Sequence, residues 1–186
     1  MHDTNEFIIQ DGVLEIYIGG DTCVTVPEGV RKIADSAFDL CGKLKEIAVA
    51  EGNPVYSSRN GALMNKKKTV LIRCPEGVRG EYAIPDGVRG IGREAFVNRG
   101  GRGPRSVTLP ESVREIGALA FEGCLRLRKI TVPAGVRHIG YYAFWQCPRV
   151  TIHAPAGSVA EAYAVENMLG LRSVPPTAID FSPEKW

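Results

Sequence analysis

Short runs of alternating apolar and polar residues recur along the chain, and each run is rich in β-branched residues. They are VTV (24–26), VTL (107–109), ITV (130–132) and VTI (150–152). An alternation of period two predicts a half-buried strand. In the first three runs the next residue is proline, and the first of them continues as Pro-Glu-Gly. This predicts a type I turn, because proline fixes φ at its second position. Each strand is therefore expected to end in a chain reversal.

The same pattern returns at a short, regular interval. Five segments share Pro-x-x-Val-Arg: PEGVRKI (27–33), PEGVRGE (75–81), PDGVRGI (85–91), PESVREI (110–116) and PAGVRHI (133–139). Four of them continue to an Ala-Phe pair that ends at Phe38, Phe96, Phe121 or Phe144, and Pro110 and Pro133 are 23 residues apart. This period predicts a solenoid whose coils consist of a strand, a turn, a second short strand and one helical turn carrying Ala-Phe inward.

Cysteine recurs in phase with the repeat. This recurrence decides whether Cys147 and His138 are a nucleophile with its base or whether Cys147 is a residue of the core. Cys41, Cys124 and Cys147 each follow the repeat phenylalanine by three residues. A column in phase with the core predicts buried small side chains that donate weakly to nearby carbonyls, rather than a nucleophile with its base. The five cysteines include no CxxC pair, so free thiols are expected.

The segments outside the regular repeat are expected to cap or interrupt the solenoid. Residues 1–23 are predicted to form an N-terminal capping hairpin around Asp11-Gly12, and residues 24–152 the solenoid of about five coils. Within it, an irregular hairpin coil is expected at about 50–82, around Asn60-Gly61 and a Lys66 to Lys68 tip. Residues 153–172 are predicted to be a capping helix that starts at a Ser158–Glu161 capping box and ends before Gly170. The tail, 173–186, contains prolines and is either disordered or laid over the last coils.

The combined pattern VTVPxGVxxIGxxAFxxCxxLxxI resembles the BspA-type class of leucine-rich repeats found in bacterial proteins, over about residues 24–152. The resemblance implies a β-rich α/β solenoid: a right-handed leucine-rich-repeat superhelix with a parallel concave sheet and short helical turns on the convex side. It also implies a non-enzymatic module that binds a protein or a glycan, with host or cell-surface adhesion as one form of that role. The chain departs from the pattern at VNRGGRGPR (97–105), where a local bulge is expected.

Composition narrows the partner class only slightly. The chain has 186 residues, 44% of them hydrophobic, a formal net charge of +2 and a pI near 8.3, which is too mild to indicate nucleic acid or a membrane. No membrane insertion is expected, and a monomer is the default. The chain as given carries no secretory signal, which predicts a cytoplasmic protein, whereas a signal sequence ahead of Met1 in the gene would make it secreted or surface-bound.

Residues with catalytic or metal-binding chemistry do not fall into productive spacings. His2, His138 and His153 lack HxH or HExxH spacing, so no metal or other cofactor is predicted. We find no carboxylate pair, nucleophile with base or phosphate loop in register, which predicts that the protein is not an enzyme.

Two groups of residues are candidates for binding a partner. The outward row of the concave sheet is one: Thr25, Thr108, Thr131 and Thr151, flanked by Lys129 and Arg149. A threonine row is also simply a good β-surface. The second group is Tyr141, Tyr142 and Trp145, at positions that hold Asp35, Ser36 and Asp39 in the first coil. Either the capping helix or tail covers these rings, or they form an exposed interface anchor.

Arginine also forms a column, since Arg31, Arg79, Arg89, Arg114 and Arg137 all follow Pro-x-x-Val. The charges could be offset by an adjacent acidic column, which consists of Glu28, Glu76, Asp86 and Glu111. The alternative is an anion-binding stripe, for which the candidates are Arg89, Arg114, Arg137 and the loop residues Arg99, Arg102 and Arg105. Polyanion or nucleic-acid binding is therefore the rival function, although nucleic acid is disfavoured, and a structural scaffold is the third possibility.

Overall fold

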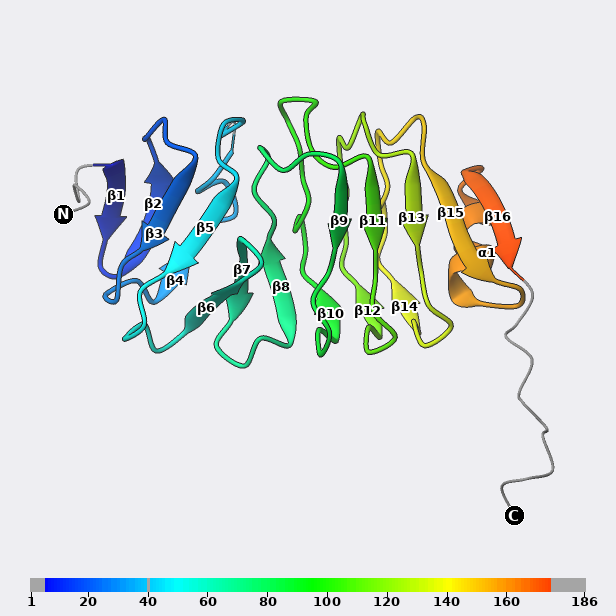
Figure 1. Cartoon of the computed structure of the whole chain (residues 1–186), viewed down its shortest axis with the longest axis horizontal. Coiled ribbons are helices and arrows are strands. Elements are labelled where there is room, and N and C mark those ends of the chain that lie inside the picture. Colours follow the sequence, from blue (N-terminus) through cyan, green and yellow to red (C-terminus); the bar gives the residue numbers. More distant parts are fainter. Residues whose placement is uncertain (1–5, 40, 175–186) are drawn as a thin grey trace, which may run out of the picture.

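The computed structural model describes residues 6–39 and 41–174. The chain winds into an elongated solenoid whose long axis runs from the N-terminal hairpin to the C-terminal helix (Figure 1). Seven strands follow one another along one side: β3 (Cys23–Val26), β5 (Glu46–Val49), β9 (Glu81–Ala83), β11 (Ser106–Thr108), β13 (Lys129–Thr131), β15 (Thr151–Pro155) and β16 (Gly170–Val174). The last five form one parallel sheet, while β3 and β5 form a separate parallel pair. The seven strands mark about seven turns of the solenoid, two more than the regular repeats predict.

A second series of strands runs along the other side. It contains the two-residue strands β4 (Lys32–Ile33), β10 (Gly90–Ile91), β12 (Glu115–Ile116) and β14 (His138–Ile139). It also contains β1 (Phe7–Gln10), β2 (Val13–Tyr17), β6 (Tyr56–Arg59), β7 (Ala62–Asn65) and β8 (Val70–Arg73). The sheet orders are β1-β2-β4 and β14-β12-β10-β8-β7-β6. The predicted second short extended piece of each coil is therefore a strand that pairs in parallel with its neighbours.

Proline turns join the two series, as the sequence predicts. The amides of Val113 and Val136 donate to the carbonyls of Pro110 and Pro133, at 3.1 and 3.3 Å. The two hairpins turn at Asp11-Gly12 and Asn60-Gly61, where all four residues have φ between 49° and 75°. Positive φ at both central residues gives the turn geometry that matches the twist of paired strands.

The Ala-Phe segments form single turns that hold the core together. Each is closed by an i to i+3 bond, such as Trp145 N to Tyr142 O at 2.9 Å. The rings of Phe96 and Phe121 stack with centroids 4.7 Å apart, and those of Phe121 and Phe144 with centroids 5.0 Å apart. Coils with identical residues in phase thus build a continuous aromatic stack inside the solenoid.

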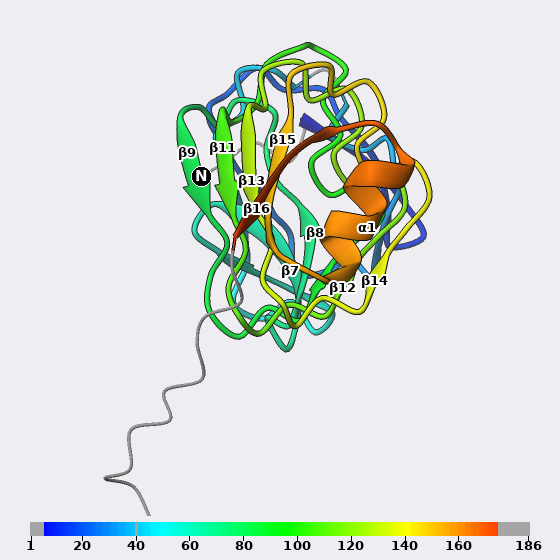
Figure 2. The ribbon, with the colours of Figure 1, turned by 90° about the vertical axis from the view of Figure 1, so that its right-hand side faces the viewer.

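The C-terminal end differs in part from the expected helix of 153–172 and tail from 173. Helix α1 (Val159–Glu166) begins at the predicted cap, since Glu161 N donates to Ser158 Oγ at 3.2 Å. It ends at Asn167 and not near Gly170, because Met168 takes the left-handed conformation, with φ 53°, that was expected of the glycine. The chain then returns as β16 beside β15, and Figure 2 shows α1 lying across this end of the solenoid. Residues 175–186 of the predicted tail lie outside the described residues.

The buried apolar residues divide into two clusters. The N-terminal core contains Tyr17 and Phe38, and the C-terminal core contains Phe96, Phe121 and Phe144. Between them the phenylalanine column is interrupted. Cys74 N donates to Ala95 O at 2.7 Å, and in the next coil Phe96 N donates to Ala120 O at the same distance, so Cys74 occupies the position of the repeat phenylalanine. The irregular coil therefore places a cysteine where the regular coils have a stacking ring.

Candidate functional site

The aromatic cluster, defined as Tyr141, Tyr142 and Trp145, lies in the Ala-Phe turn between β14 and β15. These side chains remain 62%, 57% and 47% exposed, so α1 does not cover them. Whether the tail covers them falls outside the described residues. The ring centroids of Tyr142 and Trp145 are 4.9 Å apart, and those of Tyr141 and Tyr142 are 5.8 Å apart at nearly a right angle. The three rings thus pack on one another instead of into the core.

An arginine from two coils away fixes one edge of the cluster. Arg93 Nη1 donates to Tyr141 Oη at 3.0 Å, and Arg93 Nη2 forms an ion pair with Glu94 Oε1 at 2.9 Å. The intervening coil has Ala118 at the position of Arg93 and Tyr141. Its small side chain leaves room for the tyrosine ring to reach across. The bond to Tyr141 is the largest of the causes that raise the pKa of Arg93, which stays charged.

A cleft of roughly 300 Å³ separates the aromatic cluster from α1. Its walls are mostly apolar, and amide side chains stand among them. The lining residues are Tyr142, Phe144, Trp145, Gln146, Cys147, Pro148, Tyr163, Asn167 and Leu169. Asn167 Nδ2 donates to Tyr163 O at 2.9 Å, which leaves the side-chain oxygen of Asn167 for another donor. The cleft is open to solvent beside the exposed rings.

Two residues that line this cleft have left-handed backbone conformations. Tyr142 has φ 54° and Gln146 has φ 55°. The first value is a feature of the repeat, because Glu94 and Leu119 adopt it at the same position. The second recurs in the preceding coil, but there the residue at the position of Gln146 is Gly123, with φ 70°. The last coil thus has a glutamine where glycine would fit without strain.

The threonine row on the sheet differs from the one that the sequence predicts. Thr108 and Thr131 are in register, but the next residue in that row is His153, and Thr151 pairs with Lys129 instead. The expected register was wrong by two residues. Val150 N donates to Cys147 O at 3.2 Å, and Leu127 N donates to Cys124 O at 3.0 Å. Val150 is therefore the equivalent of Leu127, the apolar residue that precedes the strand.

Two further members of that predicted surface lie elsewhere. Arg149 belongs to the exposed turn before β15 and not to the sheet. Thr25 lies on β3, which in the described part of the chain pairs with β5 alone. The sheet face therefore groups Thr108, Thr131, Thr151 and Lys129, together with His153.

The arginines of three neighbouring coils stack as predicted, but in the part of the chain that the structure describes they form no ion pair with the acidic residues of their own proline turns. Arg114 N donates to Arg89 O and Arg137 N to Arg114 O, both at 2.8 Å. None of the ion pairs within residues 6–39 and 41–174 joins these arginines to Asp86 or Glu111. Arg114 Nη1 instead donates to the carbonyls of Glu111 and Val113, at 2.6 and 2.9 Å. The guanidinium folds back over its own proline turn, so the prediction of an acidic partner column was wrong there.

The arginine loop is tied into the protein at several points. Arg99 Nε forms an ion pair with Asp39 at 2.9 Å, and Arg102 Nη1 donates to Gly42 O at 3.4 Å. The buried Asn98 accepts from Arg102 N at 2.7 Å, while Arg105 is exposed. Arg99 is therefore engaged in an internal contact, and the loop and the stacked arginines do not share one contact network.

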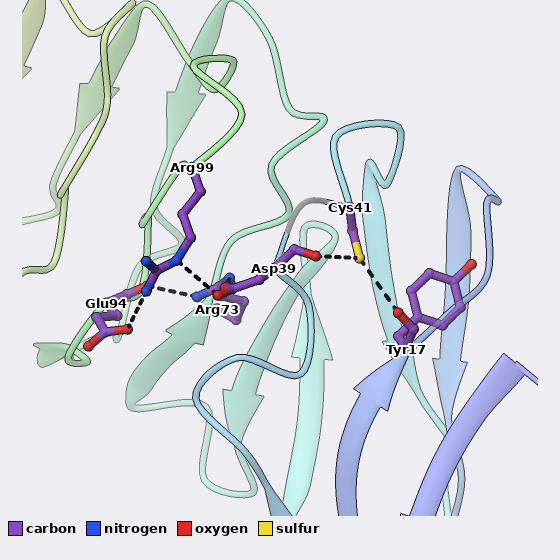
Figure 3. A network of polar contacts seen from close by, with 6 residues as sticks. All are labelled: Tyr17, Asp39, Cys41, Arg73, Glu94 and Arg99. Carbon is purple, nitrogen blue, oxygen red and sulfur yellow. Dashed lines mark hydrogen bonds and ion pairs between the residues drawn. The ribbon is translucent and has the colours of Figure 1, made fainter.

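A polar network that the sequence analysis missed stands between the two cores (Figure 3). Arg73 occupies the position that alanine holds in the regular coils, and only 6% of its side chain is exposed. Its Nη2 atom is 2.6 Å from Asp39 Oδ1, and its Nη1 atom donates to Glu94 O at 3.3 Å. Arginine directly before Cys74, within an otherwise apolar run, is the signal that could have indicated it.

Two members of the predicted cysteine column, Cys124 and Cys147, are buried as expected, whereas Cys41 is only partly buried. Cys124 Sγ lies 3.1 Å from Phe96 O, and Cys147 Sγ lies 2.9 Å from Phe121 O. The interaction with Cys147 and burial raise the pKa of the Cys124 thiol well above its ordinary value. A buried, protonated thiol is a poor nucleophile.

Residues 6–39 and 41–174 contain no group of three His, Cys, Asp or Glu residues that could hold a metal ion. No helix in that part of the chain is both long enough and apolar enough to span a bilayer.

Comparisons with known proteins agree with this architecture. A family model described as a BspA type leucine rich repeat region matches residues 21–151 and 80–174, with six copies. Among curated proteins, none matches the chain. A leucine-rich repeat protein from Eubacterium ventriosum is similar in structure, with 27% identity and a TM-score of 0.65, over 77% of this chain and 40% of that protein.

Two other solved structures share the fold at lower identity. A leucine rich cell surface protein from Faecalibacterium prausnitzii is 23% identical, with a TM-score of 0.58, over 89% of this chain and 52% of that protein. The pneumococcal vaccine antigen PcpA is 22% identical, with a TM-score of 0.56, over 71% of this chain and 38% of its own length. The matched region is thus about half of these proteins or less. The similarity confirms the predicted leucine-rich-repeat solenoid.

Proposed function

This chain belongs to the family of BspA-type leucine-rich repeats, and from that premise we propose that it is a non-enzymatic module that binds a protein partner through the aromatic cluster. One observation carries the proposal. Three aromatic side chains stand uncovered by the described residues at positions where the first coil has Asp35, Ser36 and Asp39. Tyrosine and tryptophan at such positions are the side chains that most often anchor a protein interface.

The cleft beside the cluster supports a protein as the partner. Phe144, Tyr163 and Leu169 give it apolar walls, while Gln146 and Asn167 supply amide groups among them. An apolar side chain inserted there would be desolvated, and the amides could pair with the main chain that carries it. An interface of this kind combines a buried anchor with a polar rim.

The backbone of Gln146 supports the same surface. A left-handed residue other than glycine costs roughly 1–2 kcal/mol. Such strain persists where the side chain contributes something that glycine could not. We propose that Gln146 is that case, since its side chain lines the cleft.

Photo-crosslinking tests the proposal in cells that express the gene. A photoreactive phenylalanine analogue replaces Tyr142 in one variant, and Ser36, at the same repeat position in the first coil, in the matched control. A crosslinked protein is expected from position 142 and not from position 36. The same partner captured equally from both positions would contradict the proposal.

The identified partner is then purified for a quantitative measurement. Trp145→Ala should weaken its binding by about 30-fold or more, because truncating an interface anchor costs about 2 kcal/mol. Asp35→Ala, on the turn of the first coil, serves as the control and should leave the dissociation constant unchanged. Equal affinities of both variants and the unmodified chain would rule out the aromatic cluster as the binding surface.

Adhesion at a host or cell surface is the form this function takes if the protein reaches the outside of the cell. Cell fractionation with an antibody to the solenoid decides between that location and the cytoplasm. Recovery of the protein in the surface fraction would support adhesion, and exclusive recovery in the cytoplasmic fraction would contradict it.

A further inference from the structure

Three basic side chains come together on the outer face of the parallel sheet, at its C-terminal end. Thr131, His153 and Arg172 form one row across β13, β15 and β16, and Lys129 pairs with Thr151 in the next row. Since successive residues of a strand point to opposite faces, the burial of Ile130 and Ile152 turns these side chains outward. Directly paired residues on neighbouring strands lie about 5 Å apart.

Among the residues that the structure describes, the charges around His153 are all of one sign. Lys129 and Thr131 face it from β13, Arg172 faces it from β16, and Thr151 is its own neighbour on β15. The acidic residue Glu81 lies in the same row as Lys129, but on β9, which is two strands away from β13. Partial burial and then the charges of Lys129 and Arg172 lower the pKa of His153. An anion placed among these side chains would relieve the repulsion between them.

The neighbouring positions indicate what kind of anion would fit. Hydroxyl groups surround the basic residues, and they belong to Ser106, Thr108, Thr131 and Thr151. The two rows across β9, β11 and β13 contain no large apolar or aromatic side chain, only Ala83 beside polar and charged residues. A protein interface would lack its anchor here, and single-stranded nucleic acid would lack a stacking platform. A hydroxyl-rich ligand with fixed negative charges matches this surface.

We propose that the sheet surface formed by Lys129, Thr131, His153 and Arg172 binds the sulfate or carboxylate groups of an acidic polysaccharide. This site lies on a different side of the coil from the aromatic cluster and does not depend on the protein-binding function proposed above. Arg172 supplies a planar pair of donors for an oxyanion, and Lys129 supplies a point charge. The threonine hydroxyls hydrogen-bond to the sugar.

The probe is a fluorescently labelled heparin octasaccharide, and its binding to the full chain is measured by anisotropy at low salt. Lys129→Thr and Arg172→Thr should each weaken binding about tenfold, the effect of losing one charge-assisted hydrogen bond. Both substitutions keep a strand-favouring residue at an exposed position, so circular dichroism should not change. Arg137→Gln and Arg105→Gln are the matched controls and should have no effect. Undetectable binding, or loss of binding only in the two controls, would overturn the proposal.

Proton linkage gives a second readout. Sulfate esters do not titrate in this range, whereas the bound anion raises the lowered pKa of His153, so binding takes up a proton. Affinity should therefore rise about threefold or more as the pH falls from 7.5 to 5.5. His153→Gln should remove this dependence, and His138→Gln, on β14 at the other side of the coil, should retain it. A pH dependence that survives in His153→Gln would contradict the assignment.

Two competitor probes separate the polysaccharide from other polyanions. A polyglutamate peptide and a single-stranded oligonucleotide are each titrated against the labelled octasaccharide. Both should compete only weakly. Tighter binding of either, with the same dependence on Lys129 and Arg172, would reassign the surface to that class of ligand and overturn the polysaccharide proposal.

Discussion

The turn of the first regular coil and the turn of the last are closed by the same backbone hydrogen bond but have opposite uses. Asp39 N donates to Ser36 O at 3.0 Å, and Trp145 N donates to Tyr142 O at 2.9 Å. In the first coil the outward Asp39 is held by Arg73 and Arg99. In the last coil the outward rings are left exposed by the described residues. The repeat fixes the direction in which a side chain points. The chemistry of that side chain decides whether it links coils or is available to a partner.

The interior shows the same contrast. Phe121 lies between two parallel rings, whereas Phe38 has, among the described residues, only the tilted ring of Tyr17, at 6.2 Å. Beyond Phe38 the irregular coil offers Cys74, and the Asp39–Arg73 pair stands at this interruption. Regular coils are thus joined by stacked rings, while the two cores are joined partly by a buried ion pair.

Phe121→Ala should have the largest effect on stability. Removing a fully buried ring from the middle of the stack should cost about 3–5 kcal/mol of unfolding free energy. Phe38→Ala should cost at least about 1 kcal/mol less, because it loses no stacked pair. Urea denaturation measures both values, and equal losses would contradict the contrast between the two cores.

Asp39→Ala tests the ion pair at the interruption. It leaves the guanidinium of Arg73 buried without its carboxylate, which should cost about 3 kcal/mol. Arg99→Ala is the control, because that side chain is half exposed and its loss should cost less than about 1 kcal/mol. The double variant Asp39→Ala, Arg73→Leu should recover most of the loss, and its failure to recover would argue against an ionic origin.

Gln146→Gly gives the last coil the same residue as the preceding coil has at this position. Relief of the left-handed strain should raise the unfolding free energy by about 1 kcal/mol. The reciprocal change, Gly123→Ala, should lower it by more than that, because the added Cβ would also lie 2.9 Å from the backbone oxygen of Asn98. Thermal unfolding of the two variants checks these signs, and a loss of stability in Gln146→Gly would show that the glutamine serves the fold.

Trp145→Ala should have the smallest effect on stability. An exposed side chain outside the core should change the unfolding free energy by no more than about 0.5 kcal/mol. A loss above about 2 kcal/mol in urea denaturation would mean that the cluster is part of the core, and the comparison between the two turns would fail.

Much of this structure follows from features that repeat in phase. The stacked phenylalanines, the proline turns, both Gly-containing hairpins and the Ser158 cap could all be predicted, because each depends on residues close in sequence. The aromatic cluster was also identified, since its residues depart from the other copies. The sequence left open whether the capping helix or the tail covers it.

The remaining features depend on how coils of unequal length align. Val150 was assigned to a strand because VTI alternates correctly, although this alignment places Val150 only 20 residues after Ile130, whereas the residue that pairs with Ile130 is Ile152, two residues later. Arg73 faces Asp39 only because the irregular coil places it at an alanine position. Strand β16 follows from the left-handed Met168, a conformation with no sequence signal. These contacts arise between coils, so local pattern did not indicate them.

The most direct test of the account is the solvent accessibility of Trp145, measured as acrylamide quenching of its fluorescence. The chain has two tryptophans, so Trp186→Phe makes Trp145 the sole reporter. We predict strong quenching in this full-length variant and no further increase when residues 175–186 are deleted, because the aromatic cluster is free for a partner. Weak quenching that becomes strong only after the deletion would show that the chain covers its own cluster and would contradict the proposed binding surface.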